Sequence, residues 1–102
     1  MYELLCRNRV EDYQKWRAKF DSNLPAARDA GLLLTNLWRD AEDPNNVFFL
    51  FRVSSKYTAR AFLQDPAAAE TGAAAGVLDG EYHFLTREKV DRHRTETAPD
   101  SR

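Results

Sequence analysis

The sequence has little of what several common kinds of site require. Its single cysteine, Cys6, cannot form an internal disulfide. One cysteine and two histidines are too few for a typical four-ligand zinc site, so we expect no metal. The four glycines are scattered and form no phosphate-binding loop, and we expect no cofactor: Gly31, Gly72, Gly76 and Gly80.

Long apolar runs and an excess of charge of one sign are also absent. No run of about 18 apolar residues occurs, and no basic region precedes an apolar one at the N-terminus, so we expect neither a membrane span nor a signal peptide. Fifteen Lys and Arg residues balance sixteen Asp and Glu residues, which argues against nucleic acid as a partner. These absences together predict a cytoplasmic protein.

With 102 residues, 43% of them hydrophobic, the chain is long enough for one domain with a core of its own. We place this domain at residues 1–88. The segment 89–102 is polar and has no apolar period, so we interpret it as a C-terminal tail, and His93 within it as solvated.

Hydrophobic periodicity and turn residues predict the order of the elements. A strand covers residues 2–10, and a helix capped by Asp12 follows up to Gly31, with a kink or break before Pro25. Strands over 32–39 and 47–51 flank a polar turn. A helix that starts near residues 54–55 is followed by a restart at Asp65-Pro66, an alanine-rich helix over 67–75 and a last strand over 81–87.

This order is the ferredoxin-like βαββαβ pattern of an α+β protein. Right-handed crossovers then give an antiparallel sheet in the order 4-1-3-2, with the helices on one face. The strands over 32–39 and 47–51 are apolar on both faces, so the other face of the sheet would be a large exposed apolar patch. We therefore predict a homodimer in which a second copy covers this face.

Four stretches occur in a recognisable order: residues 10–13 with Trp16, residues 38–45 before the strand 47–51, Phe62-Leu63 before Asp65-Pro66, and residues 82–85. Together they resemble the dimeric α+β barrel superfamily, which includes antibiotic-biosynthesis-type monooxygenases. The resemblance covers residues 2–88 and implies a pocket between the sheet and the helices of each protomer.

The chemistry of that superfamily is varied, so the resemblance does not choose an activity. Some members oxidise polyketide anthrones with dioxygen and no cofactor, and others cyclise polyketides, isomerise lactones or degrade haem. The haem-degrading members pair an asparagine on the first strand with a tryptophan and a histidine in the second helical region. Asn8 matches the first of these, but residues 54–80 contain neither Trp nor His, which argues against haem degradation.

Three polar residues are candidates for catalysis. Asn8 and Asn36 share their strand parity with apolar neighbours, which predicts inward-facing amides that could hold an enolate or peroxide oxygen. They could instead bond to a strand end or to the dimer partner. His83 is the one plausible base near neutral pH in the folded part, although it could also be a partly exposed strand residue.

Aromatic residues are candidates for ligand contacts. Trp16 lies on the apolar face of the first helix, from which Lys19 points away, and Trp38 could line a pocket or fill the dimer interface. Tyr82 has the same ambiguity. Cys6 is predicted to be a small buried hydrophobe and not a nucleophile.

The residues and the resemblance together predict a protein that binds a small apolar or aromatic molecule. As an enzyme it would be a cofactor-independent monooxygenase, or an isomerase or cyclase, of phenolic or polyketide-like compounds, with His83 as base and Asn8 or Asn36 at the oxyanion. The alternative is a non-catalytic ligand-binding or assembly module. Convergence of these three side chains on one cavity would favour the enzyme.

Overall fold

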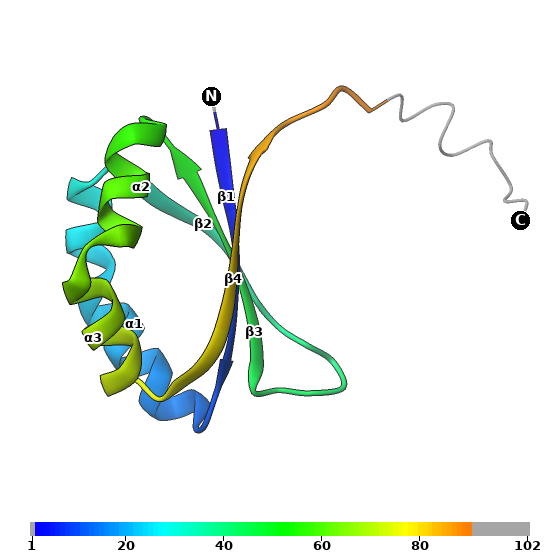
Figure 1. Ribbon diagram of the computed structural model, residues 1–102. Coiled ribbons are helices and arrows are strands. Elements are labelled where there is room, and N and C mark those ends of the chain that lie inside the picture. The colour runs from blue at the N-terminus through cyan, green and yellow to red at the C-terminus, as the bar shows by residue number, and fades with distance from the viewer. Residues whose placement is uncertain (1, 91–102) are drawn as a thin grey trace, which may run out of the picture.

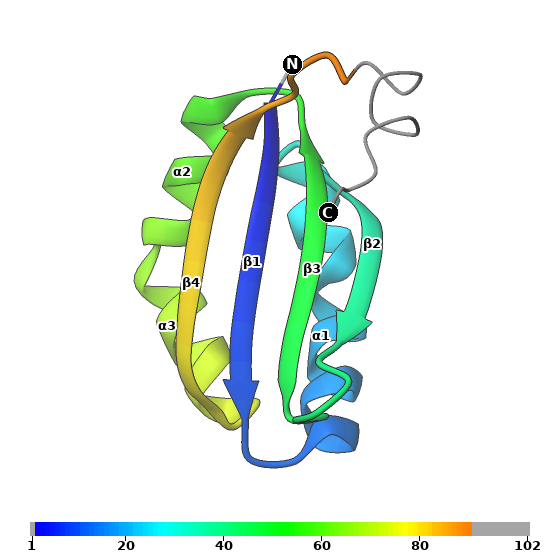
Figure 2. The same ribbon diagram turned by 90° about the vertical axis from the view of Figure 1, so that its right-hand side faces the viewer.

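The computed structural model describes residues 2–90, which form one four-stranded antiparallel sheet with three helices on one face (Figure 1). The strands are β1 (Tyr2–Val10), β2 (Leu32–Arg39), β3 (Asn46–Val53) and β4 (Val77–Thr86). The helices are α1 (Tyr13–Asp29), α2 (Lys56–Gln64) and α3 (Pro66–Ala74). The sheet order β2-β3-β1-β4 is the predicted one, and the ferredoxin-like fold class is confirmed (Figure 2).

Helix α1 begins and ends where the sequence predicts. The Asp12 carboxylate accepts hydrogen bonds from the amides of residues 14 and 15 at 3.0 and 3.4 Å. After the last turn, Gly31 takes a φ of +87°, which other residues disfavour. The predicted break before Pro25 is wrong, because α1 continues through this exposed position. A proline costs the helix one amide hydrogen bond, and Ala27, buried beyond it, keeps the last turn against the sheet.

The second helical region consists of two helices, as the restart signal predicts. Asp65 caps α3 by accepting from the amide of Ala67 at 2.9 Å, and Pro66 occupies the first helical position. Strand β4 begins at Val77, four residues earlier than the predicted start at residue 81. Asp79 and Gly80 are poor strand formers, but the Asp79 carboxylate pairs with Arg7 and Arg9 of the neighbouring strand.

The core lies between the sheet and the helices. Alternate side chains of β1 and β3 face the helices and are buried: Leu4, Cys6, Val10, Val47, Phe49, Phe51 and Val53. Trp16 of α1 is 2% exposed and stacks on Phe20, with ring centroids 4.5 Å apart. Burial of a tryptophan of this kind stabilises a domain by about 3–5 kcal/mol relative to alanine, so Trp16 is a main anchor of α1 on the sheet.

The other face of the sheet, called the open face below, carries no helix within residues 2–90 (Figure 1). An apolar strip crosses it: Leu5, Leu33, Trp38, Phe48, Leu50 and Leu85. Beside the strip, Arg7 pairs with Asp79 and Glu81.

Two further predictions concern membrane-spanning segments and the C-terminal tail. Within residues 2–90, every helix is too short or too polar to cross a membrane. Nearly all of the predicted tail, including His93, lies outside the described residues, so the boundary at residue 88 stays a prediction.

Candidate functional site

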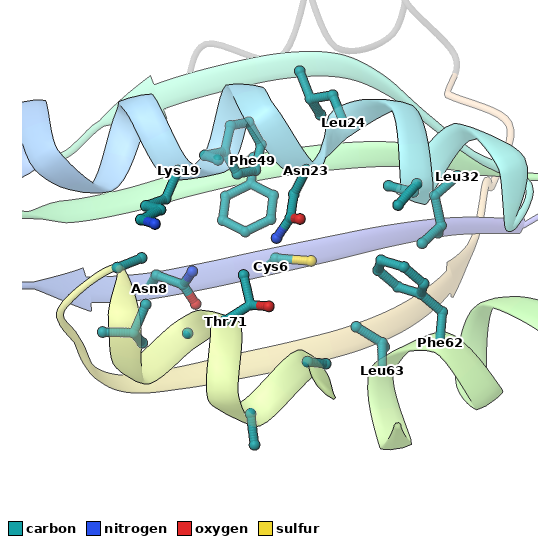
Figure 3. A pocket seen from close by; sticks show the side chains of 18 of the residues that line it. Cys6, Asn8, Lys19, Asn23, Leu24, Leu32, Phe49, Phe62, Leu63 and Thr71 are labelled. Atoms are coloured by element: carbon teal, nitrogen blue, oxygen red, sulfur yellow. The ribbon is translucent and has the colours of Figure 1, made fainter. Parts of the chain in front are cut away.

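A cavity of about 470 Å³ lies between the helices and the sheet (Figure 3). Its floor is formed by β1 and β3 and includes Cys6, Asn8 and Phe49. Helix α1 supplies one wall and the α2–α3 region the other, and Tyr82 lines the cavity from β4. This volume lies within the range of pockets that hold small organic molecules, about 300–1,000 Å³.

The short side chains of α3 leave this space unfilled. Five alanines and Gly72 in the region 67–75 line the cavity, so this wall packs beside the sheet without reaching into the gap. The sequence predicts an alanine-rich helix in this segment, but a cavity beside it is not among the sequence-based predictions. The signal is present in the composition: a helix of small residues facing a sheet cannot fill the layer between them.

The cavity has a polar end and an apolar end. Asn8, Lys19 and Thr71 gather at one end, and Leu32, Phe62 and Leu63 lie at the other (Figure 3). Lys19 is the one formally charged residue among the described residues that line the cavity. This arrangement suits a molecule with an apolar body and a polar group at one end.

Helical periodicity alone misplaces Lys19, because it predicts a side chain that points away from the apolar face of α1. In the structure Lys19, Asn23 and Ala26 line the cavity beside the buried Trp16. These three positions follow the spacing of one helix face, next to the apolar face. The spacing of these three residues can be recognised in the sequence, but only the structure shows that they face a cavity.

Asn8 lies on the cavity floor and is 7% exposed. One end of its amide is 3.3 Å from Trp16 Nε1, and the other end is 3.1 Å from both the Arg7 carbonyl and the Tyr82 hydroxyl. An indole N–H can only donate and a carbonyl can only accept, so the oxygen faces Trp16 and the nitrogen faces Arg7 and Tyr82. This orientation is half a turn from the one drawn in Figure 3.

Tyr82 and Cys6, two titratable side chains beside Asn8, are neutral near pH 7. Burial, with a smaller contribution from Cys6, raises the pKa of Tyr82, so its hydroxyl keeps its proton near neutral pH. Burial also raises the pKa of the Cys6 thiol to about 12. The prediction that Cys6 is a buried hydrophobe is thus confirmed, since the side chain is 1% exposed.

The predicted catalytic residues do not lie together. Asn8, Trp16 and Tyr82 line the cavity. Asn36, Trp38 and His83 lie on the open face, where Asn36 pairs with Leu50, and His83 with Leu5. The sheet separates the two groups, so Asn8, Asn36 and His83 do not converge on one cavity of the protomer, and the enzyme hypothesis loses the one set of catalytic residues that the sequence offers.

A β-bulge explains the position of Asn36. The pairing of β2 with β3 shifts between Leu34, opposite Phe51, and Asn36, opposite Leu50. The intervening Thr35 donates its hydroxyl to the Leu50 carbonyl at 3.1 Å. One extra residue reverses the parity of all that follow, so Asn36 and Trp38 face away from the helices although Leu32 faces them.

His83 does not reach the cavity of its own protomer. Its side chain is 59% exposed, and Nε2 lies 3.6 Å from Glu81 on the same strand face. His83 is therefore a partly exposed strand residue, which is the alternative to a catalytic base. Within residues 2–90, no cluster of three or more His, Cys, Asp or Glu side chains could hold a metal ion.

No family model matches the sequence, and no curated protein matches it either. The structure is similar to that of a mutant of SnoaB, a cofactor-independent oxygenase from Streptomyces nogalater, with a TM-score of 0.68, 17% identity and coverage of 88% of this chain and 95% of that one. It is also similar to an antibiotic biosynthesis monooxygenase, with a TM-score of 0.65, 13% identity and coverage of 87% and 100%.

A conserved protein from Methanosarcina mazei gives a TM-score of 0.66 at 12% identity, with coverage of 85% of this chain and 92% of that one. At such identities the likeness concerns the arrangement of the backbone and not the chemistry of the site. The chain therefore has the fold of the antibiotic biosynthesis monooxygenase-like proteins.

Proposed function

We propose that this protein binds one small, mostly apolar aromatic molecule per chain in the cavity between sheet and helices. The observation that carries this proposal is the cavity itself, about 470 Å³ in volume, lined by aromatic, leucine and alanine side chains with polar groups at one end. Pockets with this kind of lining take small organic ligands, with the polar groups fixing the ligand's orientation.

A substitution that fills the cavity tests this proposal. In Ala68→Phe the large side chain enters the space that Ala68 now lines, so we expect at least about tenfold weaker binding of 9-fluorenone, a rigid tricyclic ketone. Binding is measured by calorimetric titration. Ala74→Phe is the matched control, because Ala74 is exposed on the same helix and does not line the cavity. Equal affinity in the two variants would contradict the proposal.

The reaction class we propose for this cavity is cofactor-independent oxidation, or isomerisation, of a phenolic or polyketide-like compound. It is supported by the fold shared with SnoaB, whose description as a cofactor-independent oxygenase applies to that protein. In such an oxidation a ring CH₂ group loses a proton to give an enolate, which dioxygen oxidises to a carbonyl, and the second oxygen atom leaves as water. Tyr82 and Lys19 could stabilise the negative oxygen.

A non-catalytic ligand-binding module is the second candidate. It is favoured by one observation: no His, Asp or Glu lines the cavity among residues 2–90. Dithranol, a phenolic anthrone, separates the two candidates when oxygen uptake is followed with an electrode. Uptake that the wild type accelerates and Ala68→Phe does not would support the enzyme. Binding of dithranol without accelerated uptake would support the module.

We also propose that a second copy of the chain covers the open face. The apolar strip contains Trp38, which is 48% exposed, and Leu33, which is 42% exposed. Large aromatic side chains of this kind contribute strongly to interfaces between proteins. Four charged side chains beside the strip pair with one another within the chain, so none of them would lack a partner when buried against a second copy: Arg7, Arg9, Asp79 and Glu81.

Reversal of this apolar character should separate the copies. Trp38→Glu places a charge within the proposed contact, so we expect a two-chain wild type and a single-chain variant in analytical ultracentrifugation. Tyr57→Glu is the control, because Tyr57 lies on α2 and is 89% exposed. A wild type that sediments as one chain would overturn this proposal.

A further inference from the structure

We propose that Trp16 and Asn8 orient the Tyr82 hydroxyl as a hydrogen-bond donor toward the cavity, so that the preferred ligand is an aromatic molecule with an acceptor oxygen, such as a ring ketone. This inference rests on the proposed function, because it assigns one contact to the molecule that the cavity holds. It identifies the ligand by chemistry, and it gives Asn8 a positioning role.

Trp16 determines which groups donate and which accept in this set of hydrogen bonds. Its Nε1 donates to the Asn8 amide oxygen at 3.3 Å, and the amide nitrogen donates to the Arg7 carbonyl and the Tyr82 hydroxyl, both at 3.1 Å. An amide has two N–H hydrogens, and both are used here. Asn8 therefore has no free donor for a ligand, in contrast to the expectation that Asn8 itself holds the oxyanion.

The Tyr82 hydroxyl is left with its own hydrogen to donate. A phenolic hydroxyl that accepts from Asn8 keeps one O–H for another partner. Within residues 2–90, Asn8 is the one hydrogen-bond partner that the Tyr82 side chain has. Because Tyr82 lines the cavity, a ligand oxygen there can accept this hydrogen.

Gly80 supplies the room for the pair. A Cβ at this position would lie 2.9 Å from the Asn8 amide, 2.9 Å from the Tyr82 hydroxyl and 3.1 Å from the Arg7 carbonyl. The only glycines with positive φ within residues 2–90 are Gly31 and Gly76, so at Gly80 the requirement is for space and not for backbone conformation. A glycine inside a strand is otherwise unfavourable, and here it marks a close approach.

The experiment compares 9-fluorenone with fluorene, which has the same rings but a CH₂ in place of the carbonyl. Both are titrated calorimetrically into the wild type and Tyr82→Phe. One hydrogen bond of ordinary net strength changes affinity by about 3- to 10-fold, so we expect the variant to lose this factor for fluorenone and nothing for fluorene. Tyr57→Phe, outside the cavity, should change neither affinity.

The positioning role is tested at Asn8 itself. Asn8→Asp replaces the amide nitrogen, which donates to Tyr82, by a carboxyl oxygen that can accept the Tyr82 hydrogen, so this hydrogen is lost to the ligand. We expect the same selective loss of fluorenone affinity, whereas a merely structural role would lower the affinity for both ligands alike. Gly80→Ala, on the edge strand, pushes the pair apart and gives a second variant should Asn8→Asp not fold.

The outcomes separate this inference from the proposed function. Binding of both ligands with no selective loss in Tyr82→Phe would overturn the donor role and leave the proposed function standing. Binding of neither ligand by a folded wild type would overturn both. Circular dichroism and thermal unfolding confirm that each variant is folded.

Discussion

Burial holds the thiol of Cys6 in its neutral form. The side chain is 1% exposed, and burial raises its pKa from 9.0 to about 12. The thiolate is the form that reacts, so at about pH 8 we expect the native protein to react with Ellman's reagent only through transient opening, and the chain in denaturant to react at once. Absorbance of the released thiol reports this directly. Native protein that reacts as fast as the denatured chain would contradict the buried position.

The same burial makes stability depend on pH. The unfolded chain loses the thiol proton at a lower pH than the folded chain, so the free energy of unfolding falls as pH rises from 9.0 toward about 12. Below pH 9 this contribution is complete. Denaturant titrations across this range should show a shallower fall for Cys6→Ala than for the wild type, even though the variant is less stable throughout. Parallel profiles would be evidence against the shifted pKa.

Strand parity predicts the sheet face of some residues correctly and of others wrongly. Parity places Asn8 correctly because β1 pairs regularly over Tyr2 to Arg9. It fails for Asn36, because the bulge at Thr35 leaves no clear mark in the sequence. The bond from Trp16 to Asn8 joins α1 to β1, and no pattern within one element predicts such a contact.

At the scale of elements, the cap of α1 should contribute measurably to stability. The Asp12 carboxylate satisfies two amides of the first turn that have no partner inside the helix. Asp12→Ala should lower the free energy of unfolding by about 1 kcal/mol, within a range of about 0.5–2 kcal/mol.

Urea denaturation of both the wild type and Asp12→Ala measures this difference. Asp29→Ala is the control, since Asp29 lies exposed in the last turn of the same helix, where its charge does not complement the helix dipole. A loss in Asp29→Ala as large as that in Asp12→Ala would show that the cap is not the cause.

Most element boundaries are predictable because local chemistry sets them. Asp12, the Asp65-Pro66 pair and Gly31 mark helix ends through caps and backbone conformation, and the structure confirms each. The start of β4 is not predictable in this way. Asp79 and Gly80 are both poor strand formers. Their contacts are with the neighbouring strand: Asp79 pairs with Arg7 and Arg9, and Gly80 leaves room for Asn8.

For the whole molecule, the order of elements and the handedness of crossovers suffice to predict the sheet order that the structure shows. The two sides of that sheet differ in function in our account. The helix side holds the cavity for a ligand, and the open face holds the strip for a second copy. The sequence predicts both surfaces but cannot assign Asn36 and His83 to one of them, because that assignment depends on register.

A heteronuclear NMR titration of the uniformly ¹⁵N-labelled protein with 9-fluorenone tests whether the cavity is the ligand site. The two tryptophans report the two sides of the sheet, since Trp16 lines the cavity and Trp38 lies on the open face. We expect the indole signal of Trp16 to shift on titration, together with amides around Asn8 and Thr71, while the indole signal of Trp38 stays in place. Shifts confined to Trp38 and its neighbours, or no shifts at all, would contradict the cavity as the ligand site.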